Sequence, residues 1–507
     1  MSFLPLRVIA SAALVFSTTH AAHADIDAQD VWSNWQTYFE GLGYEVSATQ
    51  ARSGATLTIS DLTINVPATE ETGASTVNMN EVAFTENGDG TVDIAIPPVM
   101  PIRMQVIGED GETADVELEL RQSGLVSTVS GVPTELSNTY AAQSVDIVLT
   151  GLTIGGEKQD AEVAAVTIGM QDLSGTTRTT VGGNRVYDQD MQAVGVTYNL
   201  AFIDPEGDGD LKMDGQFADL GFTGSSAVPL VKLESSDMLA VLAAGGSTDG
   251  TFKYSAGASN VSVIDSGTEA FSAATTSDGG TLDVTLKEDG LAYSGGQNDL
   301  NVTITSPDFP VPIAFDMASA SFNLATPVQK SEEASDFALG FSFNDFSMSD
   351  MLWGMFDPSA QLPRDPATIA LDLTGKARLL FDFFDPAASG LTANSNIAPA
   401  EMETVDINKL QIKVAGAELT GNGAFRFDNS APGGVPTPIG AADLSLSGGN
   451  KLLDTLVSMG FLPEEQAMGA RMMMGLLAVP GAEPDTLNSR IEMNEQGHVL
   501  ANGQRIQ

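Results

Sequence analysis

The segment Ala114-Asp-Val-Glu-Leu-Glu-Leu-Arg121 alternates strictly between apolar and charged side chains. In an extended chain its apolar residues would share one face, because successive strand residues point to opposite sides. The same period of two recurs at 281–287, 301–305 and 409–414. These segments predict half-buried antiparallel strands.

Short glycine-containing segments separate many of these apolar runs. They are Glu86-Asn-Gly-Asp-Gly90, Glu109-Asp-Gly111, Asp278-Gly-Gly280, Glu288-Asp-Gly290 and Gly448-Gly-Asn450. Such segments are typical of tight turns between neighbouring strands. We therefore expect a mainly β protein, built as large antiparallel, curved sheets of hairpins and meanders.

A few short amphipathic helices interrupt the strand pattern. Near residue 30, Asp30 is expected to cap a helix that carries Trp32, Trp35 and Phe39 on one face and ends at Gly43. A second helix is expected at 236–243. Three more are expected in the second half of the chain, at 349–356, 451–459 and 463–479. Three of the five follow a strand-like run, which suggests a loose internal repeat of sheet plus short helix.

Residues 1–24 have the features of a secretory signal peptide. Arg7 precedes a short apolar run that ends in Ala22-His-Ala24 before Asp25. We expect cleavage between Ala24 and Asp25 and a periplasmic mature protein. The glycine-rich segment around 245 then divides the rest into a half at 25–245, with the first helix, and a half at 246–507.

Composition narrows the classes of partner and chemistry. With 67 acidic and 22 basic residues the formal net charge is −45, so nucleic acid is an unfavourable partner. There is no cysteine, which removes disulfides and thiol chemistry. After residue 24 no apolar run reaches the ~20 residues of a membrane-spanning helix. We therefore expect no transmembrane helix in the mature chain.

No motif for catalysis or for a cofactor stands out. Beyond residue 24 the chain has a single histidine, His498, in an expected turn. Arg364-Asp365, between two prolines, is expected to form a structural turn with a local ion pair. We expect neither an enzyme nor a bound cofactor.

Two weaker candidate sites remain. Asp204, Glu206, Asp208 and Asp210 resemble the start of a calcium loop, but position twelve is Gly215 rather than glutamate. We therefore favour a hairpin turn there and expect no dedicated metal site. Met468, Met472, Met473 and Leu476 make the last helix broadly apolar, which favours core packing or an adaptable lining for an acyl chain.

Several longer motifs resemble a known family. They are Asp30-Val-Trp32, Asp350-Met-Leu-Trp-Gly-Met-Phe-Asp-Pro358, Leu362-Pro-Arg-Asp-Pro-Ala-Thr368, Ala467-Met-Gly-Ala-Arg-Met472 and Ala501-Asn-Gly-Gln-Arg505. With these motifs the chain resembles the exported, uncharacterised domain of unknown function 2125. More remotely it is similar to AsmA-like envelope proteins, which are β-rich and implicated in lipid traffic.

Two functions of different class follow. The first is lipid handling or envelope assembly, with lipid or an envelope protein as partner. The alternative is a non-enzymatic periplasmic scaffold that binds no small ligand. The sequence leaves the ligand, the partner and the oligomeric state open. It also leaves open whether the apolar sheet face is an open groove or a closed core, which is what separates the two functions.

Overall fold

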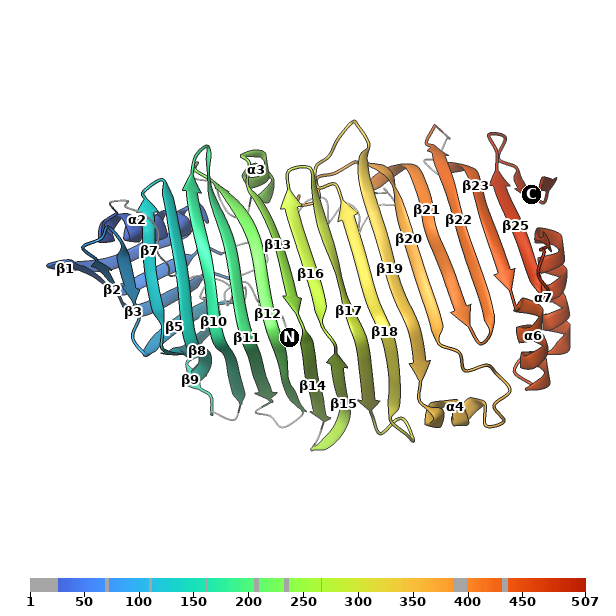
Figure 1. The fold of residues 1–507 in the computed structure, drawn as a ribbon, viewed down its shortest axis with the longest axis horizontal. Coiled ribbons are helices and arrows are strands. Elements are labelled where there is room, and N and C mark those ends of the chain that lie inside the picture. Colours follow the sequence, from blue (N-terminus) through green and yellow to red (C-terminus); the bar gives the residue numbers. More distant parts are fainter. Residues whose placement is uncertain are drawn as a thin grey trace. The chain divides into compact units, whose positions relative to one another are not determined.

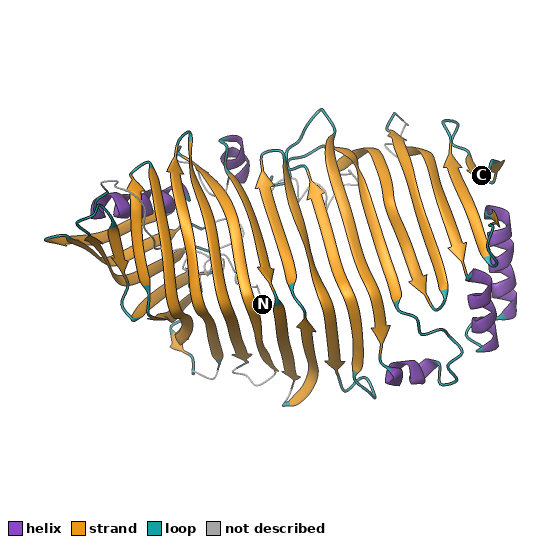
Figure 2. Cartoon of the chain, in the orientation of Figure 1, coloured by secondary structure: helices purple, strands orange, loops and turns teal. Residues whose placement is uncertain are grey.

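The computed structural model describes residues 26–68, 73–108, 112–160, 163–204, 209–231, 237–265, 267–385, 399–430 and 436–507. The chain forms two compact units, of which the first ends at Thr275 and the second begins at Thr276. This division lies further along the chain than 245/246, and β15 (Thr268–Ser277) contains it. Strands dominate both units, and the described helices are few and short (Figure 2).

The N-terminal unit holds one helix, then a long run of strands with a second, very short helix between its last members. These elements are α2 (Ala28–Gly41), β1 (Glu45–Ser53), β2 (Thr56–Val66), β3 (Ser75–Glu86), β4 (Val92–Ala95), β5 (Val99–Ile107), β6 (Thr113–Ser123), β7 (Val126–Val132), β8 (Glu135–Ile154), β9 (Glu157–Lys158), β10 (Ala164–Val181), β11 (Asn184–Ile203), β12 (Gly209–Pro229), α3 (Met238–Ala243), β13 (Ser247–Tyr254) and β14 (Ala256–Asp265). The alternating segment that begins at Ala114 forms most of β6, as the sequence predicts.

The C-terminal unit is also built mainly of strands and holds three helices (Figure 1). Its elements are β16 (Gly280–Lys287), β17 (Gly290–Thr305), β18 (Ile313–Thr326), β19 (Ser335–Met348), α4 (Asp350–Phe356), β20 (Ala367–Leu379), β21 (Ala400–Val414), β22 (Ala417–Asp428), β23 (Thr437–Ser447), α6 (Gly449–Ser458), α7 (Glu464–Leu477), β24 (Val479–Pro480), β25 (Thr486–Met493), β26 (Val499–Ala501) and β27 (Gln504–Arg505). The three expected helices of this half are all present, within two residues of their expected ends.

Helix α2 closes the core of the N-terminal unit. Its N-cap is Asp27 rather than Asp30, because the two carboxylates form a reciprocal capping box in which Asp30 is the third helical residue. Trp32 is completely buried, and the ring of Trp35 lies edge-on to Phe84 at 5.2 Å. The expected docking of this helix through its aromatic face is therefore confirmed.

The strand pairing of the N-terminal unit explains how it encloses that core. One end of β3 pairs with β5 and the other with β4, while β8 pairs with β6 at one end and β7 at the other. Because β4 also pairs with β7 and β5 with β6, the six strands β3, β4, β7, β8, β6 and β5 form a closed ring of pairings. Large apolar side chains such as Phe84, Ile59 and Leu62 are fully buried there.

The C-terminal unit is a simple antiparallel meander. Strands β16 to β23 pair each with the next, and β25 pairs with β23. Helix α4 connects β19 to β20, and α6 with α7 connects β23 to β25. In this unit α4 follows β19 and α6 follows β23, which matches the expected order of strand, then short helix.

Five aspartates interrupt long strands with a left-handed backbone. Asp61, Asp172, Asp219, Asp299 and Asp345 have φ between 44° and 51°. Aspartate is one of the few residues other than glycine that enter this region readily. The direct pairing of residues is interrupted at each of these points. At Asp345, and at Asp61 where β2 pairs with β1, the register also shifts by one residue, as in a β-bulge, which bends a strand locally.

The segment that begins at Gly448 does not form the turn between strands that the sequence predicts. Gly448 has φ 70° and begins α6 without a side-chain cap of its own. The carboxylate of Asp485 supplies the cap instead, accepting from the backbone N–H groups of Asn450 and Lys451 at 3.2 and 3.0 Å. Partial burial of this carboxyl favours its neutral form, but the hydrogen bonds outweigh that effect and lower the pKa of Asp485.

Candidate functional site: an open apolar sheet face

The register of the C-terminal meander places apolar side chains in continuous rows across one face. Directly paired residues of an antiparallel sheet point to the same side, so each row can be read from the pairing. One row runs Leu282, Gly295, Phe322, Phe341, Leu371, Leu410, Gly421, Leu444. Two flanking rows run Val284, Tyr293, Leu324, Leu339, Leu373, Ile407, Gly423, Ala442, Ile491 and Ala320, Phe343, Ile369, Ile412, Leu419, Leu446, Leu487. We call these three rows the apolar face.

The centre of the apolar face is not covered by any described element of the C-terminal unit. Phe322 is 46% exposed, Phe343 43% and Ile369 47%. Among the described residues of this unit, the adjacent Pro327 and Val328 are the only buried apolar residues larger than alanine. The large side chains that would form a core in a two-layer sheet therefore lie open to solvent.

Glycines in the sheet accommodate rings that lie across the neighbouring strand. Gly375 pairs directly with Phe337, and a Cβ added at Gly375 would lie 2.7 Å from that ring. Gly295 pairs with Phe322 in the same way, with the ring 3.1 Å from such a Cβ. Because these glycines have no side chain, the rings can lie close to the neighbouring strands, and the surface there stays apolar.

Helix α4 lies at the end of β19 (Figure 1). Arg364 holds it in place through an ion pair. The expected local ion pair exists, but its acid is Asp350 and not the adjacent Asp365. The Arg364 Nη1 atom lies 2.5 Å from the Asp350 carboxylate, and the guanidinium lies 5.6 Å from the Trp353 ring centroid. The fully buried carboxylate of Asp357 accepts two further backbone N–H groups and fixes the following loop.

The four residues proposed to line an acyl-chain site lie on the outer surface of α7. Met468, Met472, Met473 and Leu476 are each more than half exposed. The opposite side of the helix is held by the buried Ala467 and by an ion pair, 2.5 Å long, from Arg471 to Asp454 of α6. The core-packing interpretation of these methionines is therefore wrong, and they remain available as an apolar surface.

The remaining candidate residues form no described site. Asp204 follows the end of β11 and Asp210 lies in β12, whereas Glu206 and Asp208 lie outside the described residues. Across the described ranges, no three His, Asp or Glu side chains are grouped closely enough to hold a metal ion. His498 follows the turn that leads into β26, and residues 1–24, with the junction at Ala24 and Asp25, lie outside the described part. Within that part, no helix is both long and apolar enough to cross a membrane.

Comparison with known proteins identifies a family but no function. Residues 256–500 match the family described as "Uncharacterized protein conserved in bacteria (DUF2125)", which confirms the resemblance over this segment. No curated protein matches the chain. Among solved structures, the ferric citrate transporter FecA in its unliganded form is 9% identical, over 91% of this chain and 76% of that one. Its TM-score of 0.14 carries no structural argument. The looser resemblance to AsmA-like proteins stays a prediction.

Proposed function

We propose that this is an exported, non-catalytic envelope protein that holds the acyl chains of lipids on the apolar face of its C-terminal unit. The observation that carries the proposal is the exposure of large apolar side chains, such as Phe322 and Phe343, at the centre of a continuous apolar sheet. Contiguous exposed apolar surface of this kind marks interaction sites.

The chemistry of the apolar face favours a hydrocarbon chain as its occupant. The backbone N–H and C=O groups of the inner strands are already paired with neighbouring strands. A ligand on this face can therefore contact only side chains. Its rows consist almost entirely of Leu, Ile, Val, Phe, Ala and Gly. A partner with polar groups would lose their hydration there without gaining hydrogen bonds, whereas an acyl chain has no polar groups to satisfy.

The composition of the apolar face also distinguishes lipid handling from the scaffold alternative. Protein interfaces are enriched in Trp, Tyr and Arg and carry about one hydrogen bond per 100–200 Å². The three rows contain Tyr293 but no Trp and no Arg. The exposed methionines of α7 add a second apolar surface in the same unit, of a kind that adapts to irregular partners.

Export is part of the proposal and rests on the sequence of residues 1–24. An intact mass of the protein from the cell envelope should correspond to a chain that starts at Asp25. A cellular protein that keeps Met1 would overturn this part.

Uptake of a fluorescent fatty acid by the purified protein tests lipid binding on the apolar face. Phe322 and Ser321 are adjacent on β18, point to opposite faces and are both exposed. Phe322→Lys introduces a charge into the apolar face and should abolish uptake of the probe. Ser321→Lys adds the same charge to the other face and should leave uptake unchanged. Equal uptake by the two variants would favour the scaffold alternative.

A further inference from the structure

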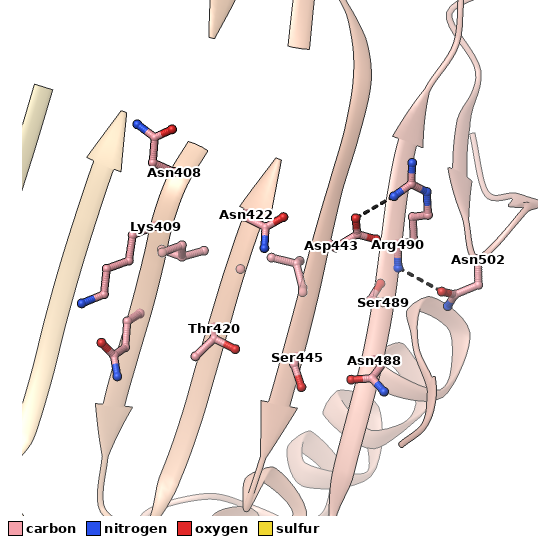
Figure 3. Close-up of a pocket in the computed structure, with 14 residues that line it drawn as sticks. Asn408, Lys409, Thr420, Asn422, Asp443, Ser445, Asn488, Ser489, Arg490 and Asn502 are labelled. Atoms are coloured by element: carbon pink, nitrogen blue, oxygen red, sulfur yellow. Dashed lines mark hydrogen bonds and ion pairs between the residues drawn. The ribbon is translucent and has the colours of Figure 1, made fainter. Parts of the chain in front are cut away.

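The opposite face of the same meander carries a polar depression towards its C-terminal edge. It spans β21, β22, β23 and β25, has a volume of about 510 Å³ and is lined by Asn408, Lys409, Gln411, Thr420, Asn422, Asp443, Ser445, Asn488, Arg490 and Asn502, together with parts of Leu410, Gly421, Leu444 and Ser489 (Figure 3). No aromatic residue lines it.

The register arranges these side chains as a two-row grid. Gln411, Thr420, Ser445 and Asn488 are paired one to the next across the four strands. Asn422, Asp443 and Arg490 form a second row two residues further along each strand, and Lys409 lies two residues from Gln411. Neighbouring members of a row are therefore separated by the strand spacing of about 4.8 Å.

Much of this grid has no hydrogen-bond partner within the described protein. Gln411 donates to Glu418, and Arg490 forms an ion pair 2.6 Å long with Asp443. No side-chain hydrogen bond or ion pair is formed by five other members within the described chain, namely Lys409, Thr420, Asn422, Ser445 and Asn488. The site therefore presents amides, hydroxyls and one ammonium group to whatever occupies it.

We infer that this depression binds a saccharide. Amides and hydroxyls both donate and accept hydrogen bonds, as sugar hydroxyls do, so each partner can satisfy the other. An apolar ligand would leave the grid without partners. A simple anion would use Lys409 alone, because the Asp443–Arg490 charges offset each other and the remaining side chains are neutral.

The affinity should be low, because each hydrogen bond replaces one to water and no ring is present for stacking. We expect dissociation constants on the order of 1 mM for a short oligosaccharide. The inference is independent of lipid binding, since the two sites occupy opposite faces. Phe322→Lys should therefore leave saccharide binding intact.

Saturation-transfer NMR with the full chain tests the inference. The probes are chitotetraose, which carries acetamide groups, and maltotetraose, which carries hydroxyls alone. Transfer to either supports the site, and a preference for chitotetraose would indicate the acetamidated sugars of a cell wall. Absence of transfer to both at about tenfold the expected constant would overturn it.

A double variant locates the binding. Asn422→Ala with Asn488→Ala removes two exposed side chains without described partners, and should reduce transfer to background while the melting temperature is unchanged. Asn298→Ala, also exposed but on β17, is the matched control and should retain full transfer. Should the double variant fold poorly, Thr420→Ala with Ser445→Ala serves in its place. Transfer undiminished in a folded double variant would also overturn the inference.

Discussion

Phe84 and Phe343 should respond very differently to truncation, because one lies in a closed core and the other on an open face. Phe84 is 0% exposed and packs against both tryptophans of α2, whereas Phe343 is 43% exposed. A fully buried phenylalanine replaced by alanine costs ~3–5 kcal/mol, including the cavity left behind. Complete burial of such a side chain is worth ~1.5–3 kcal/mol, and Phe343 achieves a little over half of it. We therefore expect about 1–2 kcal/mol for Phe343→Ala, with no enclosed cavity to add.

The Phe343→Lys variant tests more stringently whether this face is open to solvent. On an open face the lysine ammonium reaches water along its flexible stem, so the cost should stay close to that of Phe343→Ala. Under a covering layer the charge would be buried without a partner, and the cost would reach or exceed that of Phe84→Ala.

Urea unfolding followed by circular dichroism and tryptophan fluorescence measures these costs. Because the chain has two units, each variant is compared with the wild-type transition of its own unit. A Phe343→Lys variant that loses as much unfolding free energy as Phe84→Ala would refute the open face.

Three further predictions concern stability. Trp32→Phe should cost much less than the ~3–5 kcal/mol of Trp32→Ala, because the buried indole N–H has no described hydrogen-bond partner to lose; equal costs in urea unfolding would contradict this. Asp485→Asn should lose about 1 kcal/mol at neutral pH through its cap on α6. The folded-state pKa of Asp485 is lowered, so the extra stability of the wild type over Asp485→Asn is present above the unfolded pKa of ~3.9 and disappears as the pH falls through the folded-state pKa. Thermal unfolding of both proteins at a series of pH values would show this. Gly375→Val should cost ~1–3 kcal/mol, because its Cβ would lie 2.1 Å from a backbone oxygen and against Phe337, and an unchanged melting temperature would refute that packing.

Local structure could largely be predicted from the sequence. The alternation around Val116 and the aromatic spacing around Trp35 identify a strand and a helix, because both depend on neighbours a few residues away. The start of α6 could not be predicted in the same way. Its cap, Asp485, is 35 residues distant from Asn450, and the sequence near Gly448 resembles an ordinary turn.

The candidate site was harder to predict for a related reason. Alternation predicts that Phe341 and Phe343 share a face, but the same pattern suits a strand covered by a second layer. Whether a layer covers them depends on where α4, α6 and α7 pack, which no single segment determines. The methionines of α7 illustrate this limit, since a broadly apolar helix normally indicates burial and here lies exposed.

Native mass spectrometry of the protein purified from envelopes is the most direct test of lipid binding on the apolar face. Lipid should copurify with the full chain, Phe322→Lys should remove it and Ser321→Lys should not. A wild-type chain that carries no lipid and takes up no added fatty acid would show that the apolar face is not a lipid site.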